Sequence, residues 1–461
     1  MTEQTERSPA GRSLDEPARA EQRAGADDLH DDLHDGTRPA VDRHGVERHA
    51  DVPHADVPHV DVPHADVPHA DVPQAADRPA ADLSGGDRGL NAPPADDRSV
   101  VAGDRNAVTE GIGAGEAAGA AGHTVTAALP DTAPPLAEPR PLGEPRTWPR
   151  DFTDRLTAPL PGVRALARIA REGKLRPSPE SLRQIQQLPF EPGPMPDVGS
   201  ATIALTWAGH ASWVIRIGGL TVLTDPVWSR KILGTPARVT PVGVRWEDLP
   251  PIDAVVISHN HYDHLDAPTL KRLPRDVPLL LPAGLADWAR RRGFTRITDL
   301  DWWEAVELPG PEGPLRIDFV PAHHWSKRTL TDTCRSLWGG WVLTAPDGRR
   351  IHFAGDTGYG HWFEEIGRRY RGIDLALLPI GAYDPRWMLR PVHTDPEEAV
   401  RACQDLGARF LAPMHWSTFL LSAEPPLEPL HRIRAAWAAT GRPRSDLWDL
   451  PVGASRVLEE R

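Results

Sequence analysis

No aromatic side chain occurs in the first 147 residues, although the chain contains 16 Trp, 8 Phe and 4 Tyr, the first of them Trp148. A segment of this length without aromatic rings lacks the side chains that fill ordinary protein cores. It also carries 28 acidic residues, 13 arginines and no lysine, a net charge of −15, whereas residues 148–461 sum to +2. We therefore expect a long disordered acidic tail over 1–147 and one globular domain over 148–461.

Between Ala50 and Gln74 the tail repeats a five-residue unit, ADVPH, with small variations. Each unit contains a proline, which interrupts helices and central strands, so an extended solvated conformation is expected. The histidines of the repeat alternate with aspartates and would suit a tract that collects metal ions. Low-complexity sequence without a site is the favoured alternative, because nothing in the repeat preorganises the ligands.

The remaining composition excludes several classes of protein. Two cysteines cannot form a disulfide framework, the N-terminus lacks an apolar signal segment, and no run approaches the roughly 18 apolar residues that cross a bilayer. The nearly neutral domain argues against nucleic acid as a partner. These observations predict a cytoplasmic protein, with peripheral contact at the inner membrane face left open because it needs no spanning segment.

Short apolar segments alternate with helical patterns in the globular region. Strands are expected at 201–207, 213–217, 221–224, 254–258, 279–281, 316–321, 340–343, 351–354, 375–378 and 410–413, with a tight hairpin at Gly218-Gly219. Helices are expected at 161–171, 178–188, 267–273, 285–292, 362–370 and 396–406. The first helix is basic and amphipathic; we expect it to pack on the domain, with a membrane-facing role as the alternative. This order of elements predicts an α/β fold of two sheets between helical layers.

A dense set of potential metal ligands follows the predicted strand 254–258. His259, His261, Asp263 and His264 stand in ISHNHYDHLD (257–266), on a loop at the carboxyl end of that strand. Similar residues follow three further predicted strands: His323 and His324, Asp356, and His415. Imidazole and carboxylate suit Zn²⁺ and also Fe or Mn. With one of the two adjacent histidines counted, these are seven ligands, which are too many for one tetrahedral ion and fit two ions bridged by a carboxylate.

These motifs resemble those of the metallo-β-lactamase fold superfamily. The region 200–420 resembles more closely the bacterial relatives of N-acyl-phosphatidylethanolamine-hydrolysing phospholipase D. The matching segments are LTWAGHASWVI (205–215), LTDPVWS (223–229), ISHNHYDHLD (257–266), PAHHWSKR (321–328), FAGDTGY (353–359), GAYDPRW (381–387), HTDPEEAV (393–400) and MHWSTF (414–419). The resemblance implies a four-layer αββα sandwich over roughly residues 148–450 and says nothing about the tail.

The resemblance also implies a ligand set for two zinc ions. His259, His261 and His324 would hold the first ion. Asp263, His264 and His415 would hold the second, and Asp356 would bridge the two. His324 is preferred over His323 because it directly precedes Trp325, as the ligand does in the family, but whether His323 contributes to the site stays open.

Three further residues resemble family positions around the metals. Asp225 is expected to orient a ligand imidazole or the loop rather than bind metal. His393 would lie near the reacting phosphate, although the family has a polar amide before it where this chain has Val392. His210, in an Ala-Gly-His turn, also matches a motif residue, but a turn histidine bonded to backbone is an equal alternative.

A hydroxide shared by two zinc ions would attack a phosphorus or a carbonyl carbon. We therefore expect a zinc-dependent phosphodiesterase of phospholipase D type that cleaves N-acyl phosphatidylethanolamine-like phospholipids through a metal-bridging hydroxide. Asp263 and His393 would be its catalytic residues. One alternative is a lactonase or small-molecule phosphodiesterase resembling ascorbate-6-phosphate lactonase. An alternative of another class is a non-catalytic zinc-binding protein, supplied with metal by the histidine-containing tail.

Overall fold

The computed structural model describes residues 134–459 of the chain, so the ADVPH repeat and most of the acidic tail lie outside the described residues. Contacts with the domain begin before Trp148: the Arg140 amide donates to the Ala305 carbonyl, and the Gly143 amide donates to Thr298 Oγ1. Residues ahead of the boundary predicted at Trp148 thus already contact the domain. The segment is held by backbone hydrogen bonds and by an ion pair between Arg140 and Glu304, neither of which needs an aromatic ring.

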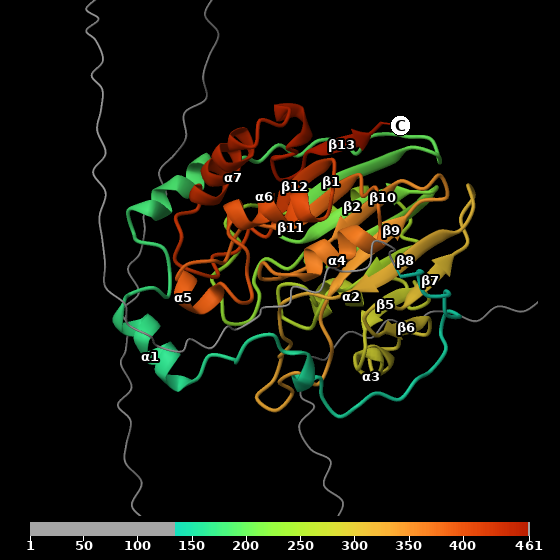
Figure 1. Cartoon of the computed structure of the whole chain (residues 1–461), viewed down its shortest axis with the longest axis horizontal. Helices are drawn as coiled ribbons and strands as arrows, with labels where there is room; N and C mark the ends of the chain where they lie inside the picture. The colour runs from blue at the N-terminus through green and yellow to red at the C-terminus, as the bar shows by residue number, and fades with distance from the viewer. Residues whose placement is uncertain (1–133, 460–461) are drawn as a thin grey trace, which may run out of the picture. The chain divides into compact units, whose positions relative to one another are not determined.

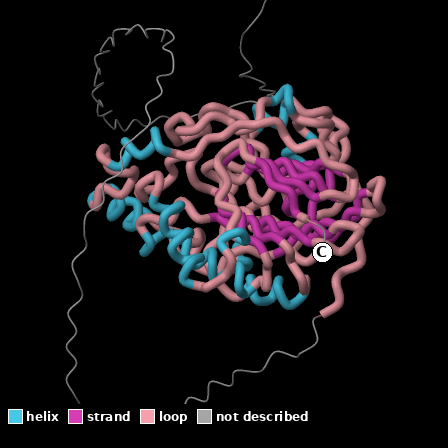
Figure 2. Tube along the Cα trace, turned by 90° about the horizontal axis from the view of Figure 1, so that it is seen from above, coloured by secondary structure: helices cyan, strands magenta, loops and turns pink. Residues whose placement is uncertain are grey.

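Two mixed β-sheets pack face to face, with helices on their outer faces (Figures 1 and 2). The first sheet has the strand order β13-β1-β2-β3-β4-β5-β6 and the second has the order β12-β11-β10-β9-β8-β7. The strands of the first sheet are β1 Ile203–Gly209, β2 Ser212–Ile217, β3 Leu220–Thr224, β4 Ala254–Val256, β5 Leu279–Pro282, β6 Ile297–Leu300 and β13 Ser455–Leu458. Those of the second are β7 Ala305–Leu308, β8 Leu315–Val320, β9 Gly340–Thr344, β10 Arg350–Phe353, β11 Leu375–Pro379 and β12 Phe410–Met414. The predicted sandwich is confirmed.

Helices cover the outer faces of the sheets: α3 contacts β6, and α6 contacts β11, β12, α4 and α7. The helices are α1 Val163–Arg171, α2 Ala267–Lys271, α3 Ala286–Arg290, α4 Trp362–Arg369, α5 Arg386–Leu389, α6 Pro396–Asp405 and α7 Glu428–Ala439. Short 3₁₀ helices occupy Thr153–Arg155, Ser181–Gln187, Trp246–Asp248 and Arg444–Asp446. The helix expected over 178–188 is therefore a 3₁₀ segment. Within residues 134–459 no helix combines the length and the apolar character required to cross a membrane.

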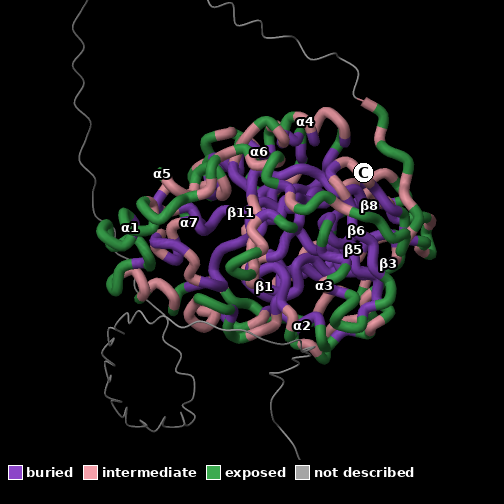
Figure 3. Tube along the Cα trace, turned by 90° about the horizontal axis from the view of Figure 1, so that it is seen from below, coloured by how far each residue is buried: buried purple, intermediate pink, exposed green. Residues whose placement is uncertain are grey.

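The core between the sheets is rich in tryptophan, and the strands are coloured as buried in Figure 3. Trp207, Trp213 and Trp341 are fully buried there. The hairpin predicted between β2 and β3 forms with Gly218 and Gly219 at φ of +60° and +76°, a conformation that glycine adopts without steric cost.

Parallel pairing brings the ends of several strands to one edge of the sandwich. β3 runs parallel to β4 in the first sheet, and β10, β11 and β12 are parallel to one another in the second. Because the carboxyl ends of parallel strands meet at the same edge, the loops that follow them come together. These loops, together with the loop that follows β8, carry the histidines and aspartates singled out by their sequence pattern.

Candidate metal centre

The loop between β4 and α2 carries four of the predicted ligands and is fixed at both ends. It leaves the buried strand after Val256 and turns where the His264 and Leu265 amides donate to the His261 carbonyl. It then enters α2, whose N-terminus is capped by the Asp266 side chain accepting from the Thr269 amide. The strand and the capped helix together hold the loop side chains in place.

The first ligand group consists of His259, His261, His324 and Asp356, whose candidate ligand atoms all lie within 4.8 Å of one another. Nε2 of His259 is 2.8 Å from Nδ1 of His261, and Nε2 of His324 is 3.3 Å from the same atom. The four residues come from loops after three different strands, so only the folded chain assembles them.

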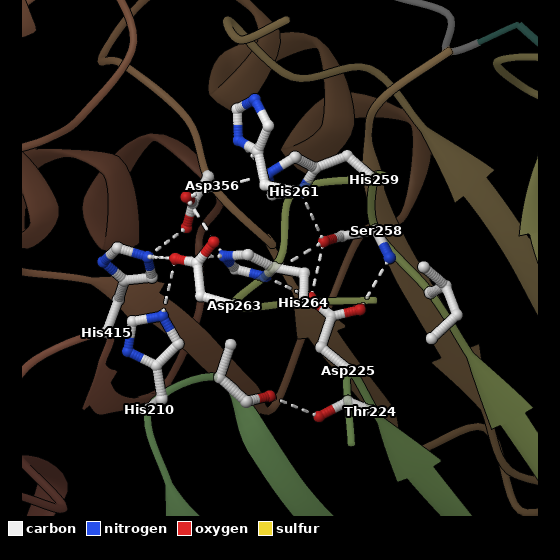
Figure 4. A network of polar contacts seen from close by, with 12 residues as sticks. His210, Thr224, Asp225, Ser258, His259, His261, Asp263, His264, Asp356 and His415 are labelled. Atoms are coloured by element: carbon white, nitrogen blue, oxygen red, sulfur yellow. Dashed lines mark hydrogen bonds and ion pairs between the residues drawn. The ribbon is translucent and has the colours of Figure 1, made fainter. Parts of the chain in front are cut away.

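The second group consists of His210, Asp263, His264 and His415, again with candidate ligand atoms within 4.8 Å of one another (Figure 4). Asp356 lies between the groups: its Oδ2 is 3.1 Å from Nε2 of His264, and its Oδ1 is 3.0 Å from Nε2 of His415. The structure thus brings together all seven residues predicted as ligands.

His210 is the residue that the sequence reasoning left undecided. Its backbone is bonded as expected for a turn, because its amide donates to Thr418 Oγ1 and its carbonyl accepts from the His415 amide. Its ring nevertheless reaches the cluster, with Nε2 3.0 Å from Oδ2 of Asp263. The matching GHAS segment was the only signal in the sequence for this contact.

Asp225 and His323 both stand outside the two groups. Asp225 accepts from the Ser258 amide and lies 2.7 Å from Nδ1 of His264, so it contacts the ring edge opposite the one that faces Asp356. His323 turns away, and its Nδ1 lies 2.9 Å from Thr157 Oγ1. Of the two adjacent histidines, only His324 faces the cluster, with its Nδ1 held by the Val392 carbonyl.

His393 borders both groups. The centroid of its ring lies 5.2 Å from that of the His324 ring and 5.5 Å from that of the His415 ring. His393 also forms a further group of candidate metal ligands with Asp356 and His415. The Arg386 guanidinium donates to the His393 carbonyl and thereby fixes the loop that carries the ring.

Comparison with known proteins identifies the superfamily. Residues 221–416 match the family model described as Beta-lactamase superfamily domain. The chain is 36% identical over 258 residues to N-acyl-phosphatidylethanolamine-hydrolyzing phospholipase D 1 of Caenorhabditis elegans, an alignment that covers 53% of this chain and 71% of that protein. The chain belongs to the beta-lactamase superfamily.

Two further superfamily relatives extend this comparison. An uncharacterized protein of Mycobacterium tuberculosis is 41% identical over 249 residues, which covers 51% of this chain and 64% of the relative. A metal-dependent hydrolase of Nitratidesulfovibrio vulgaris is 31% identical over 261 residues, covering 55% of this chain and 95% of that protein. The chain thus spans less than two thirds of the mycobacterial relative, and its superfamily includes metal-dependent hydrolases.

The surroundings of the first ligand group favour the neutral form of its histidines. Burial lowers the pKa of both His259 and His324 well below the usual range, so both rings are neutral near pH 7, the form that binds metal. In the second group burial also opposes charge, yet Asp356 raises the pKa of His415 to about 9. Burial likewise opposes the charge of Asp356, but His264 and His415 hold the pKa of this carboxyl well below its usual range.

Several buried atoms of the cluster make no hydrogen bond, although they lie close together. These atoms are His264 Nε2, His415 Nε2 and Asp356 Oδ1. Buried polar atoms almost always have a hydrogen-bond partner. Imidazole nitrogens and carboxylate oxygens that converge without hydrogen bonds fit a shared divalent cation. The residues present therefore suit a metal centre.

An apolar pocket of about 140 Å³ opens onto the first group. Residues 156–161 cover one side, and the other walls come from Trp325, α5 and the loop 391–393. His261, His324 and His393 also line the pocket. The covering segment, LTAPLP, contains no recognisable motif, and its position depends on contacts with distant residues.

Proposed function

We propose that the chain is a zinc-dependent phosphodiesterase of phospholipase D type that acts on N-acyl phosphatidylethanolamine-like lipids. The observation that carries this proposal is the apolar pocket at the metal centre, because an apolar chamber beside three histidines suits a substrate with both an acyl part and a phosphodiester. The similarity to the Caenorhabditis elegans phospholipase D supports the same substrate class.

The two ligand groups would hold two zinc ions. His259, His261 and His324 would bind one ion, and Asp263, His264 and His415 the other, with Asp356 between them. Zinc at these positions supplies Lewis acidity, which lowers the pKa of water and neutralises charge on the phosphoryl oxygens. Asp225 holds His264 through Nδ1 and leaves Nε2 directed toward Asp356, which fixes the orientation of that ligand.

His393 would contact the reacting phosphodiester. It lines the apolar pocket and lies next to His324 and His415, and its Nδ1 is buried without a hydrogen bond. Burial lowers the pKa of His393 to about 4, so the ring is neutral near pH 7. A neutral imidazole can donate one hydrogen bond to a phosphoryl or leaving-group oxygen while its other nitrogen accepts.

We also propose peripheral contact with an anionic membrane surface. α1 directly follows the segment that covers the pocket, and it turns Ile169 into the domain while Val163 and Leu166 stay exposed. Most of α1 is coloured as exposed in Figure 3. Exposed Arg164 lies between them, so apolar and cationic side chains share the outer surface of the helix. The cytoplasmic location expected from the composition stays a prediction.

Isotope transfer from solvent tests the proposed reaction. The full-length chain loaded with zinc is incubated with N-acyl phosphatidylethanolamine in H₂¹⁸O, with the Asp356→Asn variant as a control. We expect the label in phosphatidic acid and an unlabelled N-acyl ethanolamine. A zinc-loaded protein that opens lactones but leaves every phosphodiester intact would replace this proposal with the lactonase alternative. Bound zinc without turnover of any of these substrates would favour the non-catalytic alternative.

A further inference from the structure

His210 lies in the turn between β1 and β2 and is almost fully buried. Its φ of +55° is in the left-handed region that non-glycine residues rarely adopt. The pairing of β1 with β2 shifts register between Trp207 and Gly209, just before this residue. Irregularities of this kind redirect a side chain, and here the ring reaches Asp263 (Figure 4).

Among residues 134–459, the contact with Asp263 is the only hydrogen bond of the His210 ring. Nε2 of His210 is 3.0 Å from Oδ2 of Asp263, whereas Nδ1 is buried without a partner. An ionised carboxylate can only accept, so the proton of this bond belongs to Nε2 of His210. The same carboxylate oxygen lies 3.4 Å from Nε2 of His264 and 3.4 Å from Nε2 of His415.

The surrounding contacts hold His210 in this position. Trp207 Nε1 and the His415 amide both donate to the His210 carbonyl, so the turn is tied directly to the strand end that carries His415. The centroid of the His210 ring lies 4.0 Å from that of the His415 ring and 5.3 Å from that of the Phe419 ring. The donor that faces Asp263 therefore has little freedom to move.

We infer that His210 is a positioning residue of the metal centre, which acts by donating its Nε2–H to Asp263. This bond sets the rotation of the Asp263 carboxylate, so that an oxygen stays directed toward His264 and His415. The inference rests on the proposed metal centre and extends it. Residues that orient a metal ligand in this way contribute about 10–100-fold to metal affinity.

Two substitutions separate the hydrogen bond from the space that the ring fills. His210→Gln places an amide N–H near the position of Nε2, whereas His210→Met has a similar length and no donor. Both keep a side chain at the left-handed position, so the backbone cost is matched. Each full-length protein is titrated with Co²⁺ against a chelator, and the visible absorption spectrum of bound cobalt is recorded.

We expect wild type and His210→Gln to bind cobalt with affinities within a few-fold of each other and with similar spectra. His210→Met should lose about 10–100-fold in affinity at one of the two positions, with a changed spectrum for that ion. Thermal unfolding of the metal-free proteins checks the fold, and His210→Leu replaces His210→Met if the latter unfolds early.

Equal cobalt affinity in the apolar and Gln variants would overturn the positioning role, because the hydrogen bond would then have no effect. A Gln variant as weak as the apolar one would overturn it as well. A wild type that binds no cobalt would instead overturn the metal centre itself, so the two failures are distinguishable.

Discussion

Two histidines of this domain, His323 and His324, are adjacent in the sequence but have different surroundings. The His324 ring lies against His261 in the cluster, and the His323 ring lies against Thr157 in the segment that covers the pocket. The pair therefore provides a matched control for the metal proposal, since both side chains are buried and have the same size.

We predict that His324→Ala lowers bound zinc from two ions per chain toward one, because it removes a ligand of the first group. His323→Ala should keep both ions, since its ring contacts a hydroxyl and no member of the cluster. Elemental analysis of the dialysed proteins measures the difference. Loss of zinc in the His323 variant alone would reverse our assignment.

A different histidine, His352 in β10, should make stability depend on pH. Its ring is buried, and burial lowers its pKa to about 4, although the backbone of Trp341 opposes this shift. The unfolded chain, with a histidine pKa near ~6.5, therefore binds more protons than the folded protein between these values. The contribution of His352 to stability is complete above pH ~6.5 and is lost as the pH falls toward 4, by up to roughly 3 kcal/mol.

His352→Leu isolates this effect, since leucine fills the space and cannot take up a proton. The difference in unfolding free energy between wild type and variant should shift in favour of the variant as the pH falls from 7 to 4.5. Denaturant unfolding at several pH values measures it. A difference that stays constant over this range would show that the folded protein takes up the proton as readily as the unfolded chain.

At the scale of elements, every strand that we expected from the local sequence pattern forms in the structure. The pattern missed three further strands, β6, β7 and β13, whose sequences are short or mixed. β6 and β7 carry acidic residues within four-residue strands, ITDL and AVEL, and β13 pairs with a strand more than 240 residues earlier in the chain. Sheet membership of such segments is decided by their partners, which a local pattern does not contain. α6 was clear because Asp395 caps it locally, accepting from the Glu398 amide.

α1 is the element that should mediate membrane contact. The double substitution Val163→Asp and Leu166→Asp places two charges on its exposed apolar residues. We predict several-fold weaker co-sedimentation with phosphatidylglycerol vesicles, and unchanged turnover of a soluble phosphodiester, because neither side chain lines the pocket. Val457→Asp, at a partly exposed apolar position on β13, is the control. Equal sedimentation of all three proteins would remove the proposed role of α1.

At the scale of the whole molecule, the ligand residues could be predicted and the pocket beside them could not. His259, Asp356 and His415 each lie within three residues of the end of an apolar strand, so local sequence carried both their identity and their position. The pocket depends on residues 156–161 lying against residues more than a hundred positions away, and no local pattern encodes that contact. His210 falls between these cases, because its motif was visible and its contact with Asp263 was not.

The ligand groups and the pocket all lie in the C-terminal part of the chain, so the effect of N-terminal deletions can be predicted. Removing residues 1–133 should leave metal content and turnover unchanged, because both ligand groups and the pocket lie wholly within residues 134–459. Removing residues 1–161 should keep the ligands and sharply reduce turnover of the lipid, because the pocket loses one wall. Elemental analysis and product assays on both proteins decide this. A zinc-free 134–461 protein would show that the metal centre needs the tail.

The early contacts of the chain, from Arg140 to Trp148, also have a consequence for biosynthesis. These residues contact the edge strands β6 and β7 and the turn between them. Gly143 and Thr298 are 155 positions apart in the sequence, and Arg140 and Glu304 are 164 positions apart. A ribosome adding about 5–20 residues per second needs on the order of ten seconds or more to produce the partners. The segment from Arg140 to Trp148 therefore leaves the ribosome before its docking site has been made. Until it docks, both sheets present a bare edge strand on which another nascent chain could pair.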